Sequence, residues 1–161
     1  MRYHHTKNKG DLGVLNAAAD LARKGWDVLW PMTEHAAYDL VANRGAVFIK
    51  VQVKYRTMKR GSLFVDFRSA WADRHGVHLV PIDKDAIDLI CIYCPDTESC
   101  YYVDPKTCPS SVCLRVLEPA NNQRKNVRRA VDYKKLPWKY WTEDEKKNRH
   151  ARQGSNLRAG N

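Results

Sequence analysis

Three polar side chains, Asp39, Gln52 and Lys54, have the types and the spacing of a metal-dependent hydrolytic site. Twelve residues separate Asp39 from Gln52, and Lys54 follows Gln52 after one intervening residue. Carboxylate and amide oxygens are ligands that suit Mg²⁺, and an ammonium group can orient or deprotonate a water or neutralise charge on a phosphate. The pattern indicates metal-assisted phosphate chemistry. Taken by spacing alone, it also fits a turn residue followed by the solvent face of an ordinary strand.

A strand over residues 46–55 would carry two of the three groups. Residues two apart on a strand share a face, so Lys50, Gln52 and Lys54 point one way. Their apolar neighbours, Val51, Val53 and Tyr55, would face the core. The turn sequence at 43–45 predicts a hairpin to a preceding strand at 38–42, which would bring Asp39 beside the other two.

A helix precedes these strands. Apolar residues recur at helical spacing from Leu12 to Ala22, and Gly25 has the position of a C-terminal cap. Asp11 stands at the predicted start of this helix. It would complete the acidic cluster if the helix packs across the sheet, or it would cap the helix N-terminus; the two roles are compatible.

The remaining elements predict an α/β or α+β domain on a mixed sheet flanked by helices. Further strands are expected at 26–31, at 62–67 as the fourth strand of the sheet, at 86–93 and at 100–103. Residues 69–83 have no clear pattern and are expected to form a loop. Loops on a rigid scaffold often carry recognition, and this one contains Trp71, Arg74, His75 and His78.

The charge of the chain is concentrated at its C-terminal end. The 161 residues carry a net charge of +10, and residues 119–161 hold 12 Lys and Arg against 4 Asp and Glu. This distribution favours a polyanionic partner, and nucleic acid before a membrane, since no apolar run is long enough to cross a bilayer. With no secretory signal at the N-terminus, a cytoplasmic location is expected.

Five cysteines, an odd number, favour free thiols in a reducing compartment over a disulfide framework. Cys91 and Cys94 have the spacing of a zinc site, with three further cysteines nearby. However, residues three apart on a strand point to opposite faces. Free thiols are therefore the favoured interpretation, and a four-thiolate zinc site is the alternative.

Several blocks of the chain resemble the PD-(D/E)xK restriction-like nucleases, and among them the homing endonucleases encoded in group I introns of cyanobacteria. The resemblance rests on residues 7–13, 33–41 and 49–57, and it extends to 88–96 and 100–103. It implies a restriction-endonuclease-like core over residues 1–118. It also implies that Asp11, Asp39, Gln52 and Lys54 are catalytic, and that Asp11, Asp39 and Gln52 bind Mg²⁺, for which Mn²⁺ can substitute.

Two positions depart from the pattern of the wider family. Gln52 stands where most members have Glu or Asp, although the cyanobacterial homing enzymes resemble this chain in using Gln. Asp11 stands where the family often has Glu. A neutral ligand at position 52 removes one negative charge, so metal affinity should fall unless Asp11 compensates.

The implied substrate is double-stranded DNA, cut by a homo-oligomer, a dimer or a tetramer, because two antiparallel strands need two copies of the site. Residues 119–148 are expected to be a basic helical extension that contacts DNA, and residues 149–161 a disordered tail. The candidate DNA-binding residues are Lys9, Arg56, Lys59, Arg60, Arg124, Lys125, Arg128 and Arg129.

Two other functions fit the same sequence. The fold could serve a nuclease that resolves Holliday junctions or repairs DNA by recognising its shape. It could also serve a module that binds DNA without cutting it.

Overall fold

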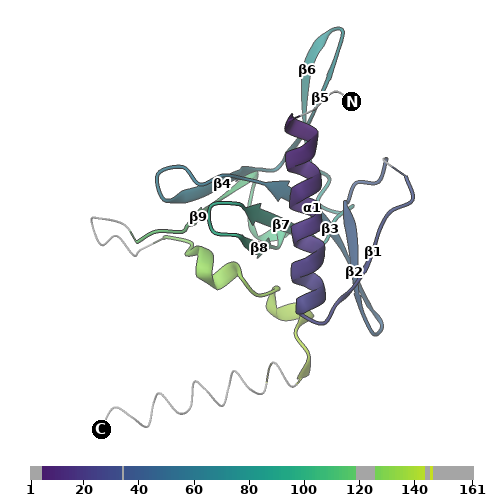
Figure 1. The fold of residues 1–161 in the computed structure, drawn as a ribbon, viewed down its shortest axis with the longest axis vertical. Coiled ribbons are helices and arrows are strands. Elements are labelled where there is room, and N and C mark those ends of the chain that lie inside the picture. The colour runs from purple at the N-terminus through teal and green to yellow at the C-terminus, as the bar shows by residue number, and fades with distance from the viewer. Residues whose placement is uncertain (1–4, 34, 119–125, 144–145, 147–161) are drawn as a thin grey trace.

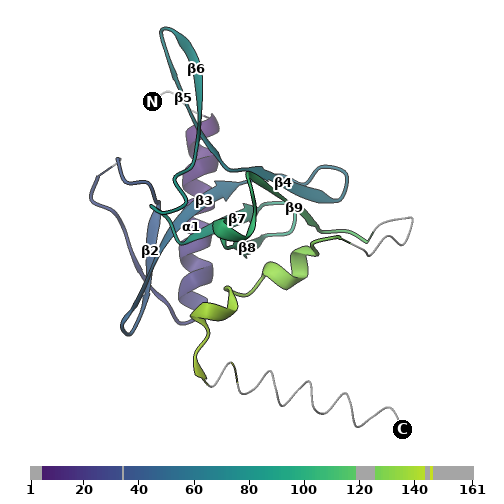
Figure 2. The same ribbon diagram turned by 180° about the vertical axis from the view of Figure 1, so that it is seen from behind.

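The computed structural model describes residues 5–33, 35–118, 126–143 and 146. It begins with α1 (His5–Arg23), which lies across a central sheet (Figures 1 and 2). The helix starts before the predicted residue and ends at Arg23, just before the predicted cap Gly25, whose φ of +77° suits glycine. Asp11 is therefore inside the helix, and the prediction that it caps the N-terminus is wrong. In the described part of the chain, no helix combines the length and apolar character needed to cross a bilayer.

The central sheet has five strands in the order β1-β2-β3-β7-β8. Its members are β1 (Asp27–Leu29), β2 (Leu40–Arg44), β3 (Val47–Tyr55), β7 (Leu89–Cys94) and β8 (Ser99–Val103). Only β3 and β7 are parallel, so the sheet is mixed, as predicted. The predicted hairpin between β2 and β3 is confirmed, with Gly45 in its turn at φ +63° and the Asn43 amide donating to the Gly45 carbonyl at 3.1 Å.

Two predictions about the strands beyond β3 are wrong. The strand β4 (Ser62–Asp66) does not extend the central sheet but pairs with β9 (Ser111–Arg115) in a separate two-stranded sheet. The expected loop at 69–83 is instead a hairpin of β5 (Arg68–Asp73) and β6 (Gly76–Pro81). The alternation of β4 is local and does not specify its distant partner β9, whereas residues 69–83 have no alternating pattern that would predict a hairpin.

Both faces of the central sheet are covered, so the face that carries Gln52 and Lys54 is not an open solvent face. One core lies between the sheet and α1 and includes Leu21, Val51 and Leu89. The other lies on the opposite face, where Ile90 and Ile92 of β7 pack with residues of β4 and β9. Because Gln52 pairs with Ile90 and Lys54 with Ile92, these two polar residues lie at the edge of the second core.

The cysteines are divided between the two cores. Cys91 and Cys100 are buried on the α1 side, and Cys94 and Cys108 are buried on the other side. The prediction that Cys91 and Cys94 point to opposite faces is therefore confirmed. With Cys113 exposed on β9, no four of these thiols can meet around one zinc ion.

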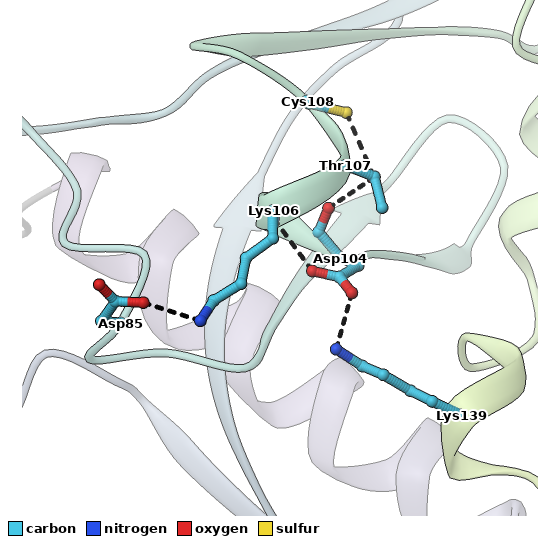
Figure 3. A network of polar contacts seen from close by, with 6 residues as sticks. All are labelled: Asp85, Asp104, Lys106, Thr107, Cys108 and Lys139. Atoms are coloured by element: carbon cyan, nitrogen blue, oxygen red, sulfur yellow. Dashed lines mark hydrogen bonds and ion pairs between the residues drawn. The ribbon is translucent and has the colours of Figure 1, made fainter.

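The described part of the C-terminal segment is bound to the domain by polar contacts. It contains two 3₁₀ helices, η2 (Ala130–Tyr133) and η3 (Trp138–Tyr140). Lys139 of η3 donates to Asp104 Oδ2 at 2.7 Å, and Asp104 also caps η1 (Pro105–Thr107) through the Lys106 N–H (Figure 3). Leu136 is buried in the α1-side core. The predicted tail, residues 149–161, lies outside the described residues.

Candidate active site

Asp39, Gln52 and Lys54 come together on one face of the β2–β3 hairpin. Asp39 directly precedes β2, and its N–H donates to the Val51 carbonyl at 2.9 Å. Since Leu40 pairs with Val51, Asp39 lies opposite Gln52. Two positions further along β3, Lys54 shares this face. All three side chains are half-buried between the sheet and its second core.

The carboxylate of Asp39 is held in a fixed direction by the backbone of β3. The Val53 N–H donates to its Oδ2 at 2.6 Å. Burial raises the pKa of Asp39, and this effect exceeds the opposing effects of the Val53 hydrogen bond and of the nearby Lys54 cation. The site thus holds a partly desolvated carboxylate, which gains from a second positive charge at its other oxygen.

Gln52 presents an amide oxygen that has no protein partner. Its Nε2 donates to the Ala37 carbonyl at 3.3 Å, which fixes the orientation of the amide. Its Oε1 is buried, and no described residue donates a hydrogen bond to it. A buried oxygen without a donor is costly unless something else satisfies it, and a hard cation would do so. Asp39 and Gln52 therefore fit Mg²⁺ chemically as a carboxylate and an amide ligand.

Lys54 is held beside these oxygens and is easier to deprotonate than an ordinary lysine. Its Nζ donates to the Arg68 carbonyl at 3.4 Å, at the start of β5. Burial lowers the pKa of Lys54, the neighbouring Arg56 lowers it further, and Asp39 opposes both. An ammonium group with a lowered pKa can exchange a proton with water or stabilise charge on a phosphate oxygen.

Asp11 is not joined to this cluster by any contact among the described residues. It is exposed on α1, which packs on the opposite face of the sheet from Gln52 and Lys54. The helix crosses the end of β3 closely, since a Cβ on Gly13 would lie 3.4 Å from the Tyr55 Cβ. Asp11 would have to reach the site around this end of the strand. Its catalytic and metal-binding roles stay predictions. Across the described residues, no three or more His, Cys, Asp and Glu side chains are grouped to hold a metal ion.

The candidate DNA-binding residues are distributed over several surfaces. Lys59 and Arg60 are exposed in the turn before β4, whereas Lys9 and Arg56 are half-buried. Arg128 is exposed, and Arg129 is paired with Glu118. Arg124 and Lys125 lie outside the described residues. The structure contains no DNA, so the DNA contacts of this set stay predictions.

Three backbone groups complete the site, and residue types gave no signal for them. The Val53 N–H, the Ala37 carbonyl and the Arg68 carbonyl each hold one of the three polar side chains. The first two follow from the hairpin register once it is known. The third depends on the β5–β6 hairpin, which the sequence pattern did not reveal.

Comparison with known proteins identifies the class of molecule that carries this site. A family model described as PD-(D/E)XK endonuclease matches residues 4–136. The chain belongs to this family. It is therefore an endonuclease, and the restriction-endonuclease-like fold expected from the sequence is confirmed.

Among solved structures, the chain is similar to the bacterial homing endonuclease I-Ssp6803I. The two share 28% sequence identity with a TM-score of 0.64, over 81% of this chain and 88% of that one. Hjc, a Holliday junction resolvase from Archaeoglobus fulgidus, is also matched, with 11% identity and a TM-score of 0.39 over 63% of this chain and 86% of that one. No curated protein sequence matches the chain.

Proposed function

We propose that this chain is a site-specific endonuclease of double-stranded DNA, of the homing type, that requires a divalent cation. The observation that carries the proposal is the buried Gln52 Oε1, to which no residue in the described part of the chain donates a hydrogen bond, on the same hairpin face as Asp39 and Lys54. The similarity to a bacterial homing endonuclease over four-fifths of the chain supports the homing type.

In this proposal each of the three side chains has one role. Asp39 and Gln52 would hold Mg²⁺, or Mn²⁺ in its place, with Asp11 as a supporting carboxylate. The bound ion supplies a more acidic water and a positive charge at the reacting phosphate. Lys54 moves a proton to or from its Nζ, or stabilises the phosphate charge. The Val53 N–H and the Ala37 carbonyl hold the side chains of Asp39 and Gln52 in a fixed orientation.

A symmetric assembly follows from the chemistry of the substrate. The chain carries one such site, and duplex DNA has two antiparallel strands related by a two-fold axis. We therefore propose that the active form is a homo-oligomer, a dimer or a tetramer, with one site at each strand.

Replacing Lys54 tests the proposal, and Lys50 provides a matched control. Both lysines lie on the same face of β3, but Lys50 is four residues from Lys54, on the other side of Gln52. Lys54→Met should lower the cleavage rate by about 10²- to 10⁴-fold, because it removes the proton-exchanging group, while DNA affinity in Ca²⁺ stays nearly unchanged. Lys50→Met should leave cleavage near the wild-type rate. The measurement is cleavage of a linear plasmid library in Mg²⁺ and in Mn²⁺, with sequencing of the cut ends.

Each alternative function predicts a different outcome of this assay. A junction-resolving enzyme would cut a cruciform and leave linear duplexes intact, whereas a homing enzyme cuts a linear duplex at a discrete sequence. A non-catalytic module would bind DNA and never nick it in either metal. Equal loss of activity in the two lysine variants would contradict the role given to Lys54.

A further inference from the structure

The β5–β6 hairpin is a two-stranded ribbon that stands out from the domain. Its strands pair with each other and with no other strand among the described residues. In Figures 1 and 2 it extends well beyond the central sheet. Val77 is 72% exposed and Leu79 is 56% exposed, and the turn residues Arg74 and His75 are exposed as well. A lone two-stranded ribbon is marginally stable in water, so a surface like this is expected to have a partner.

The base of the ribbon is fixed directly beside the candidate active site. Phe67 and Ile82, which flank the two strands, are buried in the second core, and the Ile82 N–H donates to the Phe67 carbonyl at 3.0 Å. At the first residue of β5, the Arg68 carbonyl accepts a hydrogen bond from Lys54 Nζ at 3.4 Å. This hydrogen bond thus joins the base of the ribbon to Lys54, the residue that would act on the phosphate.

The dimensions of the ribbon match a groove of DNA. Six residues in each strand span about 20 Å at the usual rise per residue. The major groove is roughly 12 Å wide and 8.5 Å deep, and it admits a two-stranded ribbon. Because Lys54 Nζ donates to the Arg68 carbonyl at the start of β5, a phosphate bound at Lys54 would lie at the base of the ribbon, close enough for the ribbon to reach the neighbouring groove.

We propose that the β5–β6 ribbon enters the major groove beside the scissile phosphate and determines part of the target sequence. This inference rests on the proposed function. Val77 and Leu79 lie two residues apart on β6 and so share one face, where apolar contact with thymine methyl groups is available. Arg74 brings a cation to the turn at the end of the ribbon.

The charges around the ribbon favour DNA over a second copy of the chain. Lys54 and Arg56 are two cations near its base, and Arg74 is a third at its exposed turn, where the neighbouring Asp73 is paired with His78. Two copies brought together here would repel each other, whereas DNA would neutralise these charges. A protein partner at this face is therefore the alternative that the experiment must separate.

Photocrosslinking distinguishes the two partners directly. A photoreactive p-benzoylphenylalanine replaces Val77, and in a control protein it replaces Phe48, which is 63% exposed at the far end of β3. The probe is a labelled duplex isolated from a randomised pool by binding to the wild-type protein in Ca²⁺. We expect the Val77 protein to crosslink to the duplex at one position, and the Phe48 protein to give no such crosslink. A crosslink from position 77 to a second protein chain, or equal DNA crosslinking at both positions, would overturn the proposal.

A pair of substitutions gives an independent measurement. Val77→Ser with Leu79→Ser should lower the ratio of affinities for the selected and a random duplex by about tenfold, because apolar base contacts are lost. The mass of the protein in solution should not change. An unchanged ratio, or a fall in oligomeric mass, would contradict the inference. Because binding is measured in Ca²⁺, this result does not depend on cleavage. If the wild type cut no DNA in Mg²⁺ or Mn²⁺, the proposed function alone would fail.

Discussion

Changing Gln52 to Glu would give the site the acidic residue that most of the family has there, and we expect it to destabilise the metal-free protein. In the wild type the amide Nε2 donates to the Ala37 carbonyl. A carboxylate at position 52 would instead place an acceptor oxygen opposite this carbonyl, which is itself an acceptor. Losing this bond costs about 1 kcal/mol. A second carboxylate beside the partly desolvated Asp39 raises the pKa of both carboxyl groups, because like charges disfavour each other's ionised form, and this repulsion adds to the loss at neutral pH.

A buried acceptor that loses its donor costs about 1–3 kcal/mol. A loss of about 2 kcal/mol lowers the Tm of a chain of this size by about 4–8 °C. The loss depends on pH in a defined direction. Because the folded-state pKa of the carboxylate pair is raised, its ionised form is the destabilised one, so the deficit is full near pH 8. It shrinks as the pH falls toward the carboxyl pKa of the unfolded chain, about 4. Thermal unfolding in EDTA at pH 8 and pH 5 measures both effects.

Mg²⁺ should reverse this destabilisation, since a ligand that binds the folded state stabilises it. Gln52→Glu should bind Mg²⁺ about tenfold more tightly than the wild type, a difference of about 1.4 kcal/mol, so its Tm should rise more steeply with Mg²⁺. Asn43→Asp is the matched control, because it also removes an amide that donates to backbone carbonyls, at 3.1 Å, but in the turn of the hairpin. Its loss of stability should not respond to Mg²⁺. Two results would show that Gln52 does not face the cation. One is that Gln52→Glu is as stable as the wild type in EDTA. The other is that Mg²⁺ stabilises Gln52→Glu and the wild type equally.

Two further predictions concern stability. Asp39→Asn should abolish cleavage and yet stabilise the metal-free protein at pH 8, because the raised pKa of Asp39 means that its ionised form costs folding free energy. In urea titrations the gain should fade as the pH falls toward the pKa of an unfolded aspartate, about 4, and a gain independent of pH would contradict this reasoning. Asp104→Ala should lower the free energy of unfolding by about 1–2 kcal/mol, because it removes both the cap of η1 and the partner of Lys139. Lys139→Ala removes only a half-exposed ion pair and should lower it by less than about 1 kcal/mol. Equal losses of the two variants in chemical unfolding would refute the separate contribution of the cap.

The sequence was sufficient for the part of the site that depends on one hairpin. The alternation along β3 places Gln52 and Lys54 on one face, and the turn at 43–45 determines the register that brings Asp39 to them. Both signals are local, because the period of a strand and the turn residues are contained in about 17 consecutive residues. The three side chains could therefore be placed together before any tertiary contact was known.

Pairings between distant segments could not be predicted in the same way. The strand β4 was recognised from its alternation, but its partner β9 begins 45 residues after the end of β4, and nothing in either segment specifies the other. The β5–β6 hairpin has exposed apolar residues on a ribbon without a core, so its pattern resembles neither a half-buried strand nor a polar loop. Asp11 was misplaced within its helix because α1 begins at His5 and continues through a polar segment that has no apolar periodicity and, with Asn8 and Gly10, no strong helix propensity, so neither signal predicts it.

The amide at position 52 also bears on the order in which the site would take up its ligands. Among the described groups around the hairpin face, one carboxylate, Asp39, is accompanied by two cations: Lys54, which interacts electrostatically with Asp39, and Arg56, which interacts electrostatically with Lys54. A carboxylate at position 52 would bring the number of negative groups on this face to two, equal to the number of cations. The neutral Gln52 leaves the face with an excess positive charge. Because such a site would bind an isolated divalent cation more weakly than a pair of carboxylates and would attract a DNA phosphate, the phosphate would supply the negative charge that the family otherwise takes from an acidic residue. Metal and DNA would then bind together, and the buried Gln52 oxygen would be satisfied only in the complex that is ready to cut.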